Sequence, residues 1–148
     1  LALKKLSKPI TSQATFSVKL RPTPGAGSPD KPGNGFIAFG DGSDDEQLIK
    51  CGVRISGKVL MIVPGPLAAS RGVSKKVGVN SDEVAELQAT VDLESRKVTA
   101  SIHGESIEMP LERPIESITW VGVCLTSVTT DFGPVEVVVG NGAASRQQ

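Results

Sequence analysis

The chain has 148 residues, 39% hydrophobic and 22% charged, a composition and length typical of one globular domain. Its 16 basic and 16 acidic residues leave no net charge to attract a polyanion, and aromatic residues make up only 3%, so nucleic-acid binding is not expected. The apolar stretches are far shorter than the roughly 20 residues of a membrane helix, which argues against a membrane span.

The sequence begins at Leu1 without an initiator Met or a leader segment, which predicts a fragment or processed product of a larger protein. Its 16 glycines and 10 prolines predict many turns and short strands. We expect a single β-sandwich domain over residues 1–148, in which 1–12 and 141–148 are terminal extensions.

Period-two alternation marks the strands of the first half. Phe16, Val18 and Leu20 share one face of a strand that ends at Pro22, and residues 22–35 form a long crossing loop rich in proline and glycine. Strands are expected next over 36–39, 48–55 and 58–63, the last two joined by a tight turn at Ser56-Gly57.

The second half predicts a meander. After an ambiguous stretch with a short strand at 76–79 and a helical turn at 81–86, strands are expected over 87–92, 98–102, 106–109, 115–125 and 134–139. His103-Gly104 supplies a tight turn because glycine accepts positive φ. The pattern predicts an all-β fold, an antiparallel two-sheet sandwich of the jelly-roll type.

The segment from Leu87 to Glu105 resembles a hairpin of laminin-G-like and concanavalin A-like jelly rolls, in which a strand ending in Asp turns into a strand that ends at a Gly corner. The segment Asp131-Phe132-Gly133-Pro134-Val135-Glu136-Val137 is similar to the last inner strand of such domains, and a strand corresponding to Ile118–Leu125 precedes it. The resemblance implies a curved sandwich from a superfamily rich in carbohydrate binders, glycan-cleaving enzymes and adhesion modules. Fold alone does not choose among these functions.

Catalytic patterns are missing from the sequence. The β-glucan-cleaving members of that superfamily resemble one another in a Glu-x-Asp-x-x-Glu strand, and this chain has no Glu-x-Asp. A dispersed hydrolase or lyase site would have to use carboxylates such as Asp92, Glu108 or Asp131. The only histidine, His103, falls in a tight turn, so we interpret it as a solvated turn residue. No catalytic residue is assigned, and the sequence favours a non-enzyme.

Four carboxylates lie within six residues, at Asp41, Asp44, Asp45 and Glu46. They supply enough oxygen atoms to bind calcium if the loop curls around the ion, although the EF-hand spacing is absent. The alternative is a solvated acidic turn. No other cofactor is indicated.

The best candidate for a ligand contact is Trp120, which alternation places on one face of its strand with Gly122 and Cys124. An aromatic ring beside a glycine can stack against a sugar, and the alternative is a tryptophan that fills the core. Arg54 and Lys50 share the polar face of their own strand, where they either bind carboxylated sugars or extend into water.

These features predict a non-catalytic carbohydrate-associated or adhesion-type binding module of a larger secreted or cell-surface protein. Its partner is then a glycan or another protein domain. The alternatives are a structural sandwich that contacts a neighbouring domain or protein, and the dispersed glycan-active enzyme. Cys51 and Cys124 are interpreted as two buried thiols or as one disulfide bridge, and the oligomeric state stays open.

Overall fold

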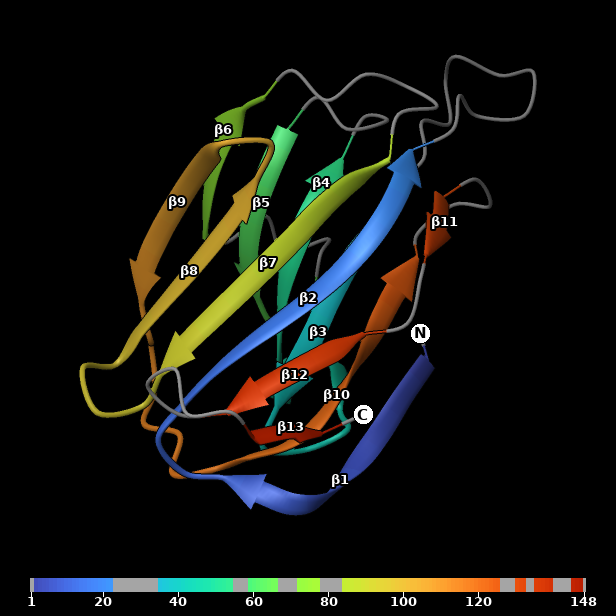
Figure 1. The fold of residues 1–148 in the computed structure, drawn as a ribbon. Helices are drawn as coiled ribbons and strands as arrows, with labels where there is room; N and C mark the ends of the chain where they lie inside the picture. Colours follow the sequence, from blue (N-terminus) through green and yellow to red (C-terminus); the bar gives the residue numbers. More distant parts are fainter. Residues whose placement is uncertain are drawn as a thin grey trace.

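The computed structural model describes residues 2–22, 35–54, 59–66, 72–77, 84–125, 130–132, 135–139 and 145–147. These residues form two antiparallel sheets that lie face to face, with one short 3-10 helix, η1 (Asp45–Gln47), before β4 (Figure 1). The predicted all-β jelly-roll sandwich is therefore confirmed. No helix in the described part of the chain has the length and hydropathy that a membrane span needs.

Sheet A has the strand order β1 (Ala2–Ile10), β10 (Ile118–Leu125), β3 (Gly35–Gly40), β4 (Leu48–Arg54), β5 (Val59–Pro64) and β6 (Val73–Lys76). Sheet B has the order β13 (Ser145–Gln147), β12 (Glu136–Val139), β2 (Gln13–Pro22), β7 (Ala85–Asp92), β8 (Lys97–Ile102) and β9 (Glu105–Pro110), and β11 (Thr130–Phe132) also pairs with β2. The chain crosses between the sheets several times, so strands distant in sequence become neighbours, as in the pairing of β10 with β3.

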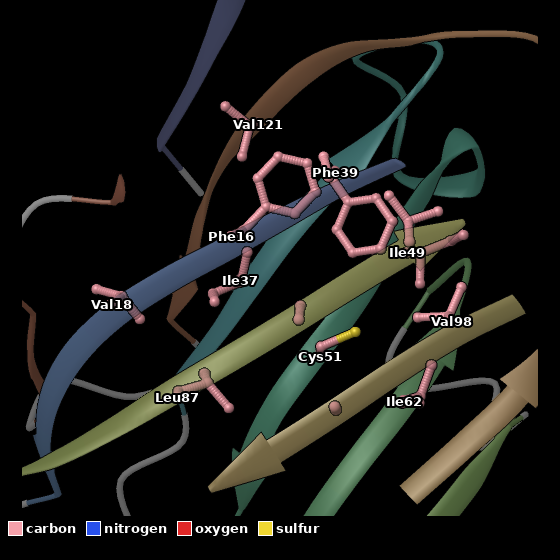
Figure 2. Packing of buried hydrophobic residues seen from close by; sticks show 14 of the residues in the cluster. Phe16, Val18, Ile37, Phe39, Ile49, Cys51, Ile62, Leu87, Val98 and Val121 are labelled. Carbon is pink, nitrogen blue, oxygen red and sulfur yellow. The ribbon is translucent and has the colours of Figure 1, made fainter. Parts of the chain in front are cut away.

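The core lies between the two sheets because every second side chain of each strand faces the opposite sheet (Figure 2). The alternation is clearest in β7, where Ala85, Leu87, Ala89 and Val91 are buried and the residues between them are not. The rings of Phe16 from β2 and Phe39 from β3 stack with centroids 5.0 Å apart and so join the two sheets.

The meander β7–β8–β9 matches its prediction, and its turns have the expected backbone. His103 and Gly104 have φ angles of 54° and 79°, the two positive values that a two-residue hairpin turn of type I′ requires. The preceding turn, residues 93–96, also contains a non-glycine residue with positive φ, Arg96 at 57°. Arg96 holds this conformation at some cost, because its Cβ crowds the backbone there.

Several predictions need correction. Residues 1–12 were expected to be a terminal extension, but Ala2–Ile10 forms edge strand β1 and pairs with β10. Within 141–148, residues 145–147 likewise form β13, which pairs with β12. In both cases backbone pairing with a sheet edge orders a segment whose side chains show little alternation. Of the strand predicted over 76–79, Lys76 is the last residue of β6 (Val73–Lys76) and Val77 is not in a strand. Of the helical turn predicted over 81–86, Ala85 and Glu86 belong to β7. Residues 78–83 lie outside the described part of the chain. The Ser56-Gly57 turn lies outside the described residues.

Candidate functional site

The three residues proposed as ligand contacts lie on one surface, the side of sheet A turned away from the core, here called the outer face. Val121 and Val123 of β10 pair with the core residues Phe39 and Ile37 of β3. Because neighbouring side chains on a strand point to opposite sides, Trp120 points outward. The register then places on the same face the residues Leu3, Lys5, Phe36, Ala38, Gly40, Leu48, Lys50, Gly52, Arg54, Val59, Met61, Val63, Ser74, Lys76, Gly122 and Cys124.

Trp120 is partly buried and partly exposed at one end of this face. Its cross-strand neighbours are Lys5 of β1, which is exposed, and Gly40 of β3. A methyl group at Gly40 would overlap the carbonyl oxygen of Gln47, so the η1 turn packs directly on β3. Trp120 therefore has a lysine as its neighbour on one strand, and on the other strand a glycine on which the polar η1 turn packs.

A glycine is required at position 122 for a structural reason that the sequence interpretation did not include. A methyl group there would overlap the carbonyl oxygen of Ala2. The glycine therefore permits the close approach of β1 to β10, and does not leave open surface beside Trp120.

Lys50 does not extend into water, in contrast to its prediction, and it is not available to a ligand. The residue is only 1% exposed. Its Nζ donates to the carboxylate and carbonyl oxygens of Asp45 and, over 2.7 Å, to the carbonyl oxygen of Gly65. Lys50 thus fastens η1 and the end of β5 to the outer face, where Phe36, Ala38, Leu48 and Val63 are also fully buried.

Arg54 is exposed at the opposite end of the outer face. Its Nη1 lies 4.0 Å from the sulfur of Met61 on β5. Trp120 is in register with Leu48, six residues before Arg54 on β4. At 3.3 Å per residue the two ends are roughly 20 Å apart along the strands, so a single sugar ring cannot contact both Trp120 and Arg54.

The acidic loop does not collect its carboxylates into one ligand set. Asp45 pairs with Lys50, and both carboxylate oxygens of Asp41 accept hydrogen bonds from Arg113, at 2.6 and 2.8 Å. These bonds lower the pKa of Asp41 and raise that of Arg113. No group of three His, Cys, Asp or Glu side chains in the described residues, which include all of 41–46, is placed to hold a metal.

A cleft of about 430 Å³ lies at the end of the sandwich where η1, the end of β5 and the β9–β10 loop meet. We call it the end cleft. Its lining residues are Glu46, Gln47, Leu48, Ile49, Pro64, Gly65, Pro66, Leu111, Glu112, Arg113 and Ile115. The volume falls in the roughly 300–1,000 Å³ range of small-molecule sites. Arg113 also donates to the carbonyl oxygen of Gln47, so its contacts close one wall of the cleft rather than face a ligand.

Two of the carboxylates considered for a dispersed catalytic site, Asp92 and Asp131, belong to residues that pair with opposite ends of β2. The carboxylate of Asp92 accepts the backbone N–H groups of Glu94 and Ser95, and these bonds lower its pKa. Glu108 lies 3.6 Å from Lys97 in an exposed ion pair. Asp131 pairs with Arg21, and Asp92 with Gln13. Eight residues of β2, about 26 Å, separate those two positions.

The two cysteines are free thiols, so the disulfide alternative is wrong. Cys51 is fully buried in the core (Figure 2), and burial raises the pKa of its thiol far above the ordinary value. Cys124 lies on the outer face and is half-buried, and burial raises its pKa as well. Sheet A itself separates the two side chains, since residues 51 and 124 point to its opposite sides.

Sequence reasoning missed two residues that shape these surfaces, Arg113 and Lys76. Arg113 lies 72 residues from its partner Asp41, so no local pattern connects them. Lys76 lies in a strand predicted to start at that residue, and its place beside Arg54 on the outer face depends on the register of β4, β5 and β6.

Known proteins resemble this chain in structure, but no sequence family matches it. No protein-family model and no curated protein sequence matches the chain. Among solved structures, a homodimeric agglutinin from chicken liver is 11% identical, with a TM-score of 0.64, over 93% of this chain and 98% of that chain. The carbohydrate recognition domain of Emp47p is 15% identical, with a TM-score of 0.65, over 94% of this chain and 77% of that chain. Chicken galectin 2 is 11% identical, with a TM-score of 0.60, over 88% and 100%. The chain therefore has the concanavalin A-like lectin jelly-roll fold that the resemblance predicted.

Proposed function

We propose that this domain is a non-catalytic carbohydrate-binding module that uses the outer face of sheet A. The observation that carries the proposal is that Trp120, a partly exposed aromatic residue on a lectin-type sandwich, has the exposed Lys5 as one cross-strand neighbour and, as the other, Gly40, on which the polar η1 turn packs. Aromatic faces provide apolar contact area, and polar groups at their edges can accept and donate hydrogen bonds to hydroxyl groups. The solved structures reported above, which include an agglutinin and a carbohydrate recognition domain, support the same class of ligand.

The rival functions have less support. A catalytic site would need two facing carboxylates, and Asp92 and Asp131 pair with opposite ends of β2. A sandwich built to dock on another protein would expose an apolar patch. In the described part of the chain the one large hydrophobic residue that is strongly exposed is Val84. A location outside the cell or at its surface, within a larger protein, belongs to the same proposal, and mass spectrometry of the native full-length product would test it.

The test is a glycan array followed by calorimetry with the best ligand. Trp120→Ala should lower the affinity by about 5- to 150-fold, because a stacked aromatic ring contributes about 1–3 kcal/mol at such interfaces. Trp120→Phe, which keeps a smaller ring, should retain part of the affinity. Glu46→Gln in the end cleft is the control and should change little. Binding that persists unchanged in Trp120→Ala, in a variant whose circular dichroism is that of the parent, would exclude this site, and a blank array would reject the proposal.

A further inference from the structure

The end of the outer face opposite Trp120 carries positive charge. Arg54 of β4 and Lys76 of β6 flank Val59 of β5 in one cross-strand row, and both are exposed. Two strand spacings put their Cα atoms about 10 Å apart. A single anionic group between the two strands would be within reach of both long side chains.

The guanidinium of Arg54 is directed toward β5, since its Nη1 lies 4.0 Å from the sulfur of Met61. Met61 is paired with Ser74 of β6, which is also exposed. Arg54, Met61, Ser74 and Lys76 therefore form one constellation, here called the basic patch. It combines two cations and a hydroxyl group with the apolar side chain of Met61.

The basic patch lacks an acidic counterpart among the described residues. The outer-face positions on β1, β3, β4, β5, β6 and β10 include no Asp or Glu. Carboxylates elsewhere form ion pairs with other lysines, as Asp45 does with Lys50 and Glu105 with Lys75. Among the described residues, therefore, no carboxylate pairs with Arg54 or Lys76.

We propose that the basic patch binds the acidic groups of a carboxylated or sulfated glycan, an inference that rests on the proposed carbohydrate function and names its ligand class. A guanidinium donates two parallel hydrogen bonds to a carboxylate or a sulfate, which an uncharged hydroxyl group cannot accept in the same way. Lys76 adds a second cation, the Ser74 hydroxyl donates a further bond, and Met61 with Val59 contacts the ring. The net charge of the whole chain is zero, so a preference for acidic glycans must arise locally and not from a general field.

A matched pair of ligands tests the inference: an oligogalacturonide and its fully methyl-esterified form, which share a backbone and differ in charge. A sulfated oligosaccharide and a neutral glycan panel accompany them, and poly-glutamate serves as an anion without sugar. The variants are Arg54→Gln, Lys76→Gln and the double variant. Lys19→Gln is the control, because Lys19 is an exposed lysine on sheet B, on the side of that sheet that is turned away from the core. Affinities are measured by calorimetry at two salt concentrations.

We expect acidic glycans to bind more tightly than their uncharged counterparts. Each substitution in the basic patch should lower the affinity for them by about tenfold, with no effect of Lys19→Gln and no effect on neutral ligands. Equal affinity for the acid and its ester would overturn the inference and leave the carbohydrate function standing. Equal losses in Lys19→Gln, or equally tight binding of poly-glutamate, would overturn it too, because either result indicates unspecific attraction. A failure to bind any glycan would reject both proposals together.

Discussion

Removing Asp45 should destabilise the domain more than removing Lys50, although the two side chains form one ion pair. The pair is asymmetric: the Lys50 side chain is 1% exposed, and the Asp45 side chain is 55% exposed. Asp45→Ala leaves the ammonium group buried, with only the carbonyl oxygens of Asp45 and Gly65 as acceptors. An uncompensated buried charge costs about 3–5 kcal/mol, and the two carbonyls place the expected loss near 3 kcal/mol.

Lys50→Met removes the buried charge and keeps most of the apolar stem. The carboxylate of Asp45 then faces water, and two carbonyl oxygens lose a donor, which amounts to about 1–2 kcal/mol. The double variant should resemble Lys50→Met alone, because Asp45 without its partner is a solvated carboxylate. These comparisons depend on the exposure of each partner, not on the strength of the pair.

The assay is urea unfolding at pH 7, followed by circular dichroism and analysed as a two-state transition. Lys97→Met is the matched control, because Lys97 and Glu108 are both about half exposed and 3.6 Å apart, and such a pair contributes less than about 1 kcal/mol. If Lys50→Met lost as much stability as Asp45→Ala, the desolvation argument would be refuted.

Three further results are expected. Arg96→Gly should stabilise the domain by about 0.5–1 kcal/mol, since glycine relieves the positive φ of this turn, and a lower thermal midpoint would contradict this. The hydrogen bonds from Arg113 lower the pKa of Asp41, so their contribution to stability is present above the unfolded carboxyl pKa of about 3.9 and is lost as the pH falls through the lower folded value. In Arg113→Gln the difference in unfolding free energy between pH 7 and pH 2.5 should therefore be smaller, and an unchanged difference would count against the pair. Under native conditions a thiol reagent should modify Cys124, and Cys51 only after unfolding, as peptide mass spectrometry would show; early labelling of Cys51 would contradict its burial.

The strands that face the core on one side could be predicted, because alternation directly records which side is buried. β7 and β8 show this pattern, and the His103-Gly104 turn has its own local signal. Strand β1 was missed because few of its side chains face the core, so its sequence shows little alternation. It is an edge strand with exposed lysines at Lys4, Lys5 and Lys8, as is common where a sheet must not pair further.

The candidate site was predictable only as far as strand faces are. Alternation predicted the face of its own strand on which each of Trp120 and Arg54 lies, and only the register of the sheet puts the two residues on one face. The burial of Lys50 could not be predicted, because it depends on η1 and the end of β5 folding over the sheet. Arg113 finds Asp41 across 72 residues, a contact that only the three-dimensional arrangement of two loops creates.

The likeness to lectin structures concerns the fold, whereas the residues of the outer face determine which ligand the domain can contact. The fold is shared at identities of 11–15%, since many sequences with apolar alternation toward the core are compatible with one sandwich, and outward side chains are free to change. In this chain the centre of the outer face is closed, with Ala38 fully buried and Lys50 nearly so. Exposed groups remain at its two ends, at Trp120 and at Arg54 with Lys76. The two proposed binding sites therefore lie at opposite ends of this face, far enough apart for substitutions at the two ends to have additive effects.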